Sequence, residues 1–570
     1  MMVKTQTLST LIFAFVVAGL PPVMAEVLQS NGPVLDSQMQ NRQIFVAANG
    51  NRSRRKAVRS RSKKSSTGEV SSGKKRRDPN FAKAKALANA HKYDLASRLL
   101  FQMSRNPKYQ KEAAQIKYVL GLMLYELKLH QSAAFVFFDV IKNESRRDPK
   151  SKYLRLSLEK LALSADSLNS DVLLKYAIKQ VKEDEFPASN RDMLYYRIGE
   201  INLNEKKYIE AARQFSRIKE NSLFYTRARY KLGLSLAEAG QTEKAVVVFD
   251  DLAQFSSRFG VTNSNRVNAL MGKARVLYQR KDFSEATEVY RSIPRDTPQW
   301  HDALFESSWS MVRDGQFRAA LSNFHSLHSS FYEDIYQPES LIVRAIVYLY
   351  ICRHEEMGKV LDLFSKVYKP SYRDLRDLVK SAHEPITYYR EIAGLQESLG
   401  DSSENSKIRV GEGRIPKLIG RHILDESDVK RAMSYLHKLD EERDRISSMS
   451  IDWRSSSVGQ YSIKIVDRRI ESTRKMIGLL VRRHILSIME SLRRFSEQEG
   501  LLKFEMLSSK REALRNEIAS KGVEPLQIDE ETERNFYVQN GFDYWPFKGE
   551  YWLDEIGNYH YVGVRACEQQ

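Results

Sequence analysis

Side chains that do chemistry in other proteins are scattered through this 570-residue sequence rather than grouped. Three histidines in the C-terminal third, His422, His437 and His484, stand on predicted helical stretches. None has a second histidine or a carboxylate at a recurring ligand spacing, so no metal site is expected. The acidic run at 440–442 (Asp-Glu-Glu) is typical of a solvated helix face more than of a catalytic acid pair.

Phosphate-binding motifs are also missing from the sequence. The Gly-Glu-Gly run at 411–413 follows no predicted strand and is interpreted as a loop. Of the two cysteines, Cys352 lies in an apolar helical stretch and is expected to be a small core residue. A disulfide with Cys567 in an oxidising compartment is the alternative, and it would staple the tail to the last repeat. The sequence therefore predicts no catalytic residue, no cofactor, no metal and no enzymatic activity.

The helices that would carry a binding site are arranged as a sequence repeat. A small residue, an alanine and an aromatic residue recur after 34 residues. The two clearest copies are Gly199, Ala211 and Phe215, then Gly233, Ala245 and Phe249. This period indicates stacked helical hairpins. The small residues let neighbouring helices approach closely, and the aromatic ring fills the space between hairpins that cannot bury an apolar face alone.

The same triplet extends in both directions and gives six fair copies and one decayed copy. The fair copies outside the central pair start at Ala84, Gly121, Ala274 and Ser308, and the decayed copy comprises Ala345, Met357 and Leu361. The stretch 154–181 has room for a further copy, but its register is unclear. A solenoid is therefore predicted over residues 81–370.

Over these residues the chain resembles the tetratricopeptide repeat family. The best matches are Leu232-Gly233 with Ala245 and Phe249, and, in a later copy, Ala286, Tyr290 and Pro298. The sequence departs from the family at the early tryptophan and at most terminal prolines. The resemblance implies a right-handed solenoid that binds peptides or protein segments in a concave groove, and it implies no catalysis.

The resemblance also implies which side chains line that groove. The aromatic candidates are Tyr118, Tyr196, Tyr230, Phe305, Trp309 and Tyr350. Such rings suit peptide recognition because they bury much area at small entropic cost. Arg275 and Arg313 are expected to pair a carboxylate in the same groove. The alternatives are that the rings only pack between helices and that the arginines are only solvated.

The N-terminal 25 residues are predicted to be a signal peptide. An apolar run from Leu8 to Leu20 is followed by small residues at Val23 and Ala25, which suits cleavage before Glu26. An uncleaved anchor is the alternative, although the run is short for a membrane span. The chain is therefore expected to be exported, to the periplasm of a Gram-negative envelope.

Residues 26–80 are predicted to be a disordered basic arm. Twelve basic residues fall between positions 51 and 77, against Glu69 alone, and they supply much of the chain's net charge of +19. The polyanion-binding candidates are Arg54, Arg55, Lys56, Lys63, Lys64, Lys74, Lys75, Arg76 and Arg77. In an exported protein the expected ligand is anionic lipid or cell-wall polymer. A solvated linker is the alternative, and no nucleic acid is expected because no aromatics interleave these charges.

Three segments follow the repeats. Residues 371–424 are predicted to be a loop-rich connector. Residues 425–520 are predicted to form a coiled-coil helical hairpin, with seven-residue steps at Ile463, Ile470 and Ile477. It either stands out as an arm, pairs with a second chain or packs on the solenoid.

Residues 521–570 carry alternating aromatics around Gly557-Asn558, which predicts a small β-hairpin. This tail either folds back on the chain or docks on another protein. It is similar to the aromatic tail of large tetratricopeptide-repeat envelope proteins of predatory and gliding deltaproteobacteria.

The sequence thus favours a mostly α protein: a solenoid, then a long coiled-coil region and a β-hairpin-like tail. The predicted function is an exported scaffold that binds envelope proteins and helps assemble an envelope complex, in motility or secretion. A non-catalytic accessory of a cell-wall enzyme is the alternative. A cytosolic nucleic-acid binder would require that the signal peptide is misidentified.

Overall fold

The computed structural model describes residues 79–181, 191–255, 263–400, 414–519, 551–559 and 561. Within these ranges every regular element is a helix, and none of the helices combines the length and the hydropathy that a membrane crossing requires. The predicted signal peptide, the polyanion-binding residues of the basic arm and Cys567 lie outside the described residues.

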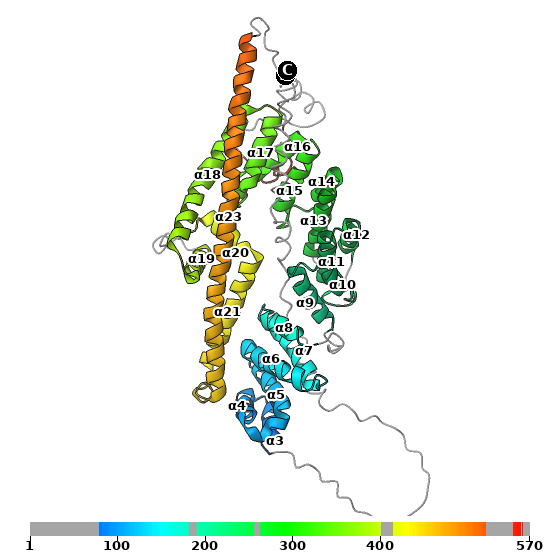
Figure 1. The fold of residues 1–570 in the computed structure, drawn as a ribbon, viewed down its shortest axis with the longest axis vertical. Helices are drawn as coiled ribbons and strands as arrows, with labels where there is room; N and C mark the ends of the chain where they lie inside the picture. The colour runs from blue at the N-terminus through cyan, green and yellow to red at the C-terminus, as the bar shows by residue number, and fades with distance from the viewer. Residues whose placement is uncertain are drawn as a thin grey trace, which may run out of the picture.

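The described chain begins with eight consecutive helical hairpins, which form an arc (Figure 1). Two short 3₁₀ helices, η4 (Pro107–Glu112) and η7 (Ser330–Tyr332), lie between hairpins. The eight pairs are α3 (Pro79–Asn89) and α4 (Tyr93–Arg105), α5 (Ala113–Glu126) and α6 (His130–Arg147), α7 (Lys152–Ser167) and α8 (Val172–Ile178), α9 (Arg191–Asn204) and α10 (Tyr208–Ser216), α11 (Tyr225–Glu238) and α12 (Thr242–Gln254), α13 (Asn263–Arg280) and α14 (Phe283–Arg291), α15 (Trp300–Arg313) and α16 (Phe317–Leu327), and α17 (Pro338–Tyr350) and α18 (His354–Ser381).

A residue with positive φ marks the turn inside every hairpin. The eight residues are His91, Lys128, Asn169, Lys206, Gly240, Lys281, Gly315 and Cys352. In each predicted copy this residue stands seven positions after the small residue of the first helix. Asn169 therefore sets the register of the stretch that was unclear in the sequence, and its triplet is Ala162, Leu174 and Ile178, all buried.

The packing of the triplets confirms the predicted repeats. The aromatic ring of the second helix lies directly on the small residue of the first helix of its own hairpin. A Cβ added to Gly199 would lie 2.6 Å from Phe215, and one added to Gly233 would lie 2.7 Å from Phe249. The ring of Phe249 also lies against Gly272 of the next hairpin, where an added Cβ would be 2.6 Å away. Contact between these two hairpins thus depends on a second glycine that the triplet pattern did not include.

The predicted loop-rich connector at 371–424 is wrong where the structure describes it. Helix α18 continues through Pro370 to Ser381, and α19 (Pro385–Gly400) and α20 (Lys417–Asp425) follow. Residues 401–413 lie outside the described ranges. A proline inside a helix costs about 3 kcal/mol. That cost is offset by burial of the flanking side chains, including Tyr368, Leu375 and Leu378.

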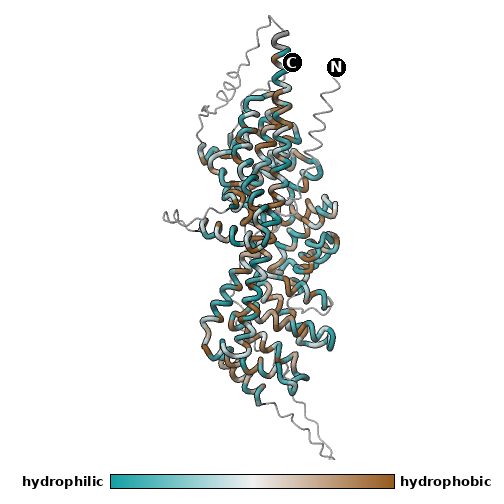
Figure 2. Tube along the Cα trace, turned by 60° about the vertical axis from the view of Figure 1, so that its left-hand side comes forward, coloured by the Kyte–Doolittle hydropathy of each residue, from teal (hydrophilic) through white to brown (hydrophobic). Residues whose placement is uncertain are grey.

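The predicted helical hairpin is present as α21 (Ser427–Ser448), α22 (Ile451–Arg454) and α23 (Ser457–Ala519), hereafter the closing hairpin. Ile470 and Ile477 of the seven-residue pattern are buried. With 63 residues, α23 is about 95 Å long. Hydrophilic and apolar residues alternate along it (Figure 2), as in an amphipathic helix.

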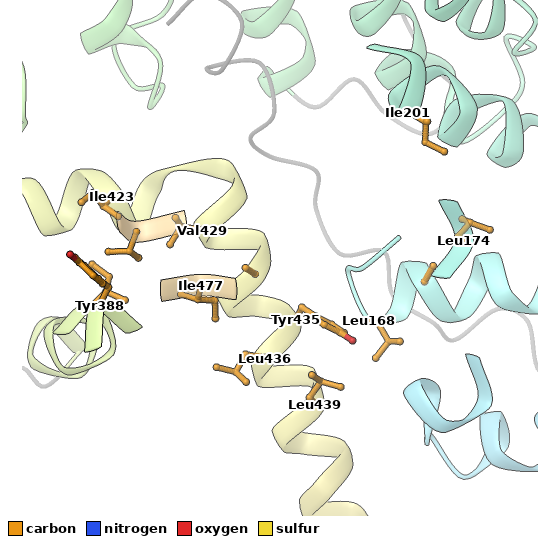
Figure 3. Close-up of a cluster of buried hydrophobic side chains, with 14 of the residues drawn as sticks. Leu168, Leu174, Ile201, Tyr388, Ile423, Val429, Tyr435, Leu436, Leu439 and Ile477 are labelled. Carbon is orange, nitrogen blue, oxygen red and sulfur yellow. The ribbon is translucent and has the colours of Figure 1, made fainter. Parts of the chain in front are cut away.

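The closing hairpin does not stand out as a free arm. It packs on α4 and α6 near the start of the arc and on α17, α18 and α19 near its end. Figure 1 shows α21 and α23 running along the open side of the arc. In Figure 3, Tyr435 of α21 is directed toward Leu168 of the repeats, and Val429 and Ile477 lie toward Tyr388 of α19. The hairpin therefore packs on its own solenoid.

The described part of the tail, residues 551–559, forms turns, so the predicted β-hairpin is wrong there. The turn predicted at Gly557 exists, with φ of +86°. Its backbone N–H donates to Ser326 Oγ at 2.8 Å, and Arg295 donates to the Asp554 carbonyl at 3.3 Å. The rings of Tyr551 and Tyr559 lie against His325. This segment folds back on α14–α16, where side-chain donors and acceptors of the repeats replace a strand partner.

Candidate functional site

The candidate binding surface is the side of the first helices α9, α11, α13 and α15 that faces the closing hairpin, hereafter the inner face. The hairpin passes close enough for the Arg431 guanidinium of α21 to interact electrostatically with Glu200 of α9. Because each repeat rises beside the next, residues at equivalent positions of successive first helices form rows along this face.

Three of the predicted aromatic residues pack mainly between helices. Tyr196 is only 5% exposed, and its ring lies 5.9 Å from that of Phe215. Tyr118 lies 6.1 Å from Phe137, and burial raises the pKa of Tyr118 to about 12. Tyr230 lies 5.8 Å from Phe249. These rings hold the hairpins together, as the packing alternative predicts.

The remaining aromatic candidates are more accessible. Phe305 and Trp309, one turn apart on α15, are half-buried and pack against the core with part of each ring exposed. Tyr350 is 38% exposed and stacks on Phe317 at 5.3 Å. Arg313 lies over the ring of Phe283 at 5.3 Å, so its guanidinium contacts the second helix of the preceding hairpin.

Arg275 is already paired within the protein. Its Nε and Nη2 donate to the two carboxylate oxygens of Glu306 at 2.8 and 2.6 Å, and the hydroxyl of Tyr290 donates to the same carboxylate at 2.9 Å. Arg275 is 8% exposed. Bidentate pairs of this kind are strong and geometrically specific. The structure therefore gives Arg275 a role between repeats rather than as a receptor for an external carboxylate.

An ionic cluster on the inner face was not predicted from the sequence. Glu200 accepts a hydrogen bond from Arg197 at 2.9 Å and pairs with Lys231 of the next repeat at 3.4 Å. Burial opposes ionisation of Glu200, but Lys231, Arg197 and Arg431 together lower its pKa to about 2. Only the three-residue spacing of Arg197 and Glu200 was visible in the sequence, because Lys231 and Arg431 come from other elements.

Two buried contacts tie the closing hairpin to the first repeats. The carboxylate of Glu442, which is 3% exposed, accepts hydrogen bonds from the backbone N–H groups of Gln131 and Ser132 at 2.7 and 3.1 Å. These N–H groups belong to the first turn of α6, where helices need external acceptors. Trp453 is fully buried and donates from Nε1 to Ser97 Oγ of α4 at 3.0 Å. The expectation that the run 440–442 is solvated is therefore wrong for Glu442.

A third tie joins the hairpin to the last repeat. Glu499 of α23 is 2% exposed and pairs with Lys369 of α18 at 2.9 Å and with Lys503 at 3.0 Å. Burial opposes ionisation of Glu499, but hydrogen bonds from Ser365, Lys369 and Lys503 lower its pKa. The hairpin is thus fixed at both ends of the arc, and the inner face of the intervening repeats lies between these fixed points.

Glu442 gives a testable pH dependence. Burial raises the pKa of its carboxyl to about 7, from about 4.5 in the unfolded chain. The folded state binds the proton of the Glu442 carboxyl more tightly than the unfolded chain does. Protonation of Glu442 therefore stabilises the fold fully below pH 4.5, and this stabilisation is lost as the pH rises toward 7. We expect the free energy of unfolding to fall by on the order of 1–3 kcal/mol across this window.

The comparison that isolates this effect is Glu442→Gln, since an amide does not titrate. Urea unfolding at pH 5 and pH 7.5, followed by circular dichroism, should show a smaller pH difference for Glu442→Gln than for the wild type. Glu441→Gln, one residue away and with a side chain 42% exposed, serves as the control and should keep the wild-type difference. An equal pH difference in wild type and Glu442→Gln would contradict the prediction.

The histidines are not all isolated. His484 Nε2 lies 2.9 and 3.1 Å from the two carboxylate oxygens of Asp428, and His422 Nε2 lies 3.4 Å from Glu426. His437 pairs only with Glu441 among the ion pairs of the described residues. The sequence did not reveal the pair of His484 and Asp428, because these residues come from α23 and α21. His422–Glu426 and His437–Glu441 are each four residues apart, so the expectation that no carboxylate recurs at a ligand spacing is wrong.

Cys352 does not lie within a helix as predicted. It occupies the positive-φ turn between α17 and α18, with φ of +58°. The residue is disulfide-bonded, so the free core cysteine expected from the sequence is wrong. The alternative, a disulfide with Cys567, involves a residue outside the described ranges.

Residues 227–255 match the family model described as tetratricopeptide repeat. This segment covers most of α11 and all of α12, so the hairpin in the centre of the arc is a tetratricopeptide repeat. No curated protein matches the chain.

Among solved structures, a Rap protein complexed with competence and sporulation factor is 13% identical, with a TM-score of 0.27, covering 65% of this chain and 99% of that one. The Cut9–Hcn1 hetero-tetramer of APC/C is 11% identical, with a TM-score of 0.21, covering 78% and 83%. At these TM-scores the likeness carries no information about function.

Proposed function

We propose that this protein is an exported, non-catalytic scaffold that holds an extended segment of a partner protein against the inner face. The observation that carries the proposal is the closing hairpin, fixed at both ends of a repeat array whose first helices face it. Stacked repeats present extended surfaces for partner segments. Here such a segment would lie between two walls, with Phe305 and Trp309 as anchors.

The proposed location rests on the sequence of residues 1–25, whose apolar run and small-residue cleavage site suit export. The basic residues between 51 and 77 would bring the scaffold to anionic lipid or wall polymer. Together these features support a role in assembling an envelope complex, in motility or secretion.

The test is capture of partners by crosslinking in intact cells. A double variant, Phe305→Ala with Trp309→Ala, should reduce capture of specific envelope partners by on the order of 30-fold or more, because a single buried aromatic anchor already contributes about 2 kcal/mol. Tyr176→Ala is the matched control, since Tyr176 is 62% exposed on α8, a second helix of the array. Circular dichroism verifies that each variant remains folded.

Undiminished capture by the folded double variant would place the binding surface elsewhere. The partners also separate the two functional candidates. Capture of structural components of an envelope complex supports the scaffold. Capture of a wall-synthesising enzyme, together with altered wall composition in a deletion strain and normal assembly of the complex, supports the accessory role.

A further inference from the structure

We propose that His422, Glu426, Asp428 and His484 form a binding site for one divalent transition-metal ion, with Zn²⁺ the best chemical match. The four residues come from α20, from the junction between α20 and α21, from the first turn of α21, and from the middle of α23. The site would therefore join three helices. All four residues come from outside the eight hairpins of the array, and the proposal does not depend on the proposed function.

The geometry brings donor atoms to the separations that a metal site requires. One donor atom each from Glu426, Asp428 and His484 lie within 4.8 Å of one another. His422 Nε2 adds a fourth, at 3.4 Å from Glu426 Oε1. Zinc binds nitrogen and oxygen at about 2.0–2.2 Å in tetrahedral sites, which places neighbouring donor atoms about 3.4 Å apart. His422 is not part of the group whose donor atoms all lie within 4.8 Å, so its side chain would have to rotate to become the fourth ligand.

The chemistry of the donor set suits zinc rather than calcium or magnesium. Imidazole nitrogens are donors that suit zinc, which also accepts carboxylate oxygens, whereas calcium and magnesium prefer oxygen alone. Two carboxylates also balance the charge of a divalent ion.

Without metal, the same groups form an ion-pair network, which is the competing interpretation. Asp428 accepts hydrogen bonds from His484 and from Arg483. The side chain of Arg483 is 60% exposed, so it can leave toward solvent when a metal takes the carboxylate. A bound metal ion would supply to Asp428 the positive charge that Arg483 now supplies. It would also displace the proton that lies between His484 and Asp428.

The site's position indicates what the ion would do. The ring of Tyr336, just before α17, lies 4.8 Å from that of His422, and Arg421 of α20 pairs with Asp334. The junction of α20 and α21 is therefore already in contact with the repeats. A metal held there would fix this junction to α23 and so fix the closing hairpin relative to the later repeats.

The experiment uses the full chain without a histidine tag, stripped of metal with a chelator. Isothermal titration with ZnCl₂ should show one site per chain, and thermal unfolding should shift upward with added zinc. His484→Ala and His422→Ala should each weaken binding by about 10- to 100-fold or more. Co²⁺ should give the visible absorption of a tetrahedral site in the wild type and lose it in both variants.

The chain provides a matched control in His437 and Glu441, a histidine–glutamate pair with the same four-residue spacing and no further ligand in the metal-competent group. His437→Ala should bind zinc like the wild type. Absence of stoichiometric binding to the wild type would overturn the proposal, as would binding that survives His484→Ala or is lost in His437→Ala. Cobalt absorption reports on the ligands directly. If His422→Ala or His484→Ala lowers stability but keeps the tetrahedral spectrum, that result would also count against the site.

Discussion

Replacing Trp453 with alanine is expected to lower the free energy of unfolding by about 3–5 kcal/mol. Trp453 is the largest fully buried side chain in the described structure, and it fills the space between the closing hairpin and α4. Its removal leaves a cavity and also deprives Ser97 Oγ of its hydrogen-bond donor. Chemical denaturation of the full chain, monitored by circular dichroism, measures the change.

The control is Trp552→Ala, which removes the same side chain where it is 57% exposed. Its expected effect is below about 1 kcal/mol, because little apolar surface is buried there. Equal effects of the two substitutions would show that the contact between the hairpin and α4 contributes little to stability. The hairpin would then be a loosely attached element rather than a fixed wall of the inner face.

The second large effect is expected for Gly233→Val. An added Cβ would lie 2.7 Å from the ring of Phe249, and the ring cannot move away because Gly272 lies on its other side. Overpacking of this kind costs about 1–3 kcal/mol, and valine adds two methyl groups at the tightest point. The clash therefore outweighs the gain of up to about 1 kcal/mol that usually follows removal of a helical glycine.

Gly394→Ala is the matched control, since Gly394 is an exposed glycine inside α19 with no atom near its would-be Cβ. It should stabilise the protein by up to about 1 kcal/mol. Combining Gly233→Val with Phe249→Leu should restore part of the loss by making room. A destabilisation unchanged by the second substitution would mean that the strain comes from the backbone rather than from the ring.

The repeat array was predictable because its rules are local. The spacing of Gly199, Ala211 and Phe215 depends only on how one hairpin closes on itself. The copy at 154–181 was unclear because leucine and isoleucine, at positions 174 and 178, replace the usual alanine and aromatic. Leu174 and Ile178 fill the same buried positions with different side chains. The positive-φ turn at Asn169 shows that they occupy these positions.

The features that were predicted incorrectly from the sequence share one physical cause, which is contact between segments far apart in the chain. Pro370 is a helix-breaking signal by itself, and only packing against the rest of the protein keeps α18 continuous. Glu442 belongs to an acidic run and becomes buried because α6 offers free N–H groups. His422 and His484 lie on different helices that the fold brings together, so no sequence spacing relates them. Arg275 looked available because its partner Glu306 belongs to the next repeat.

The hydrogen bond from Trp453 to Ser97 joins residues 356 positions apart. In an open solenoid each repeat depends only on its neighbours, so the array folds and unfolds as a linear series. A link between the first and last parts of the chain makes the terminal repeats depend on each other as well. Because such distant contacts slow folding, closure would be the last event as the chain is completed. A chain cut short after the repeats would keep its local hairpins but lose the cooperativity between its ends.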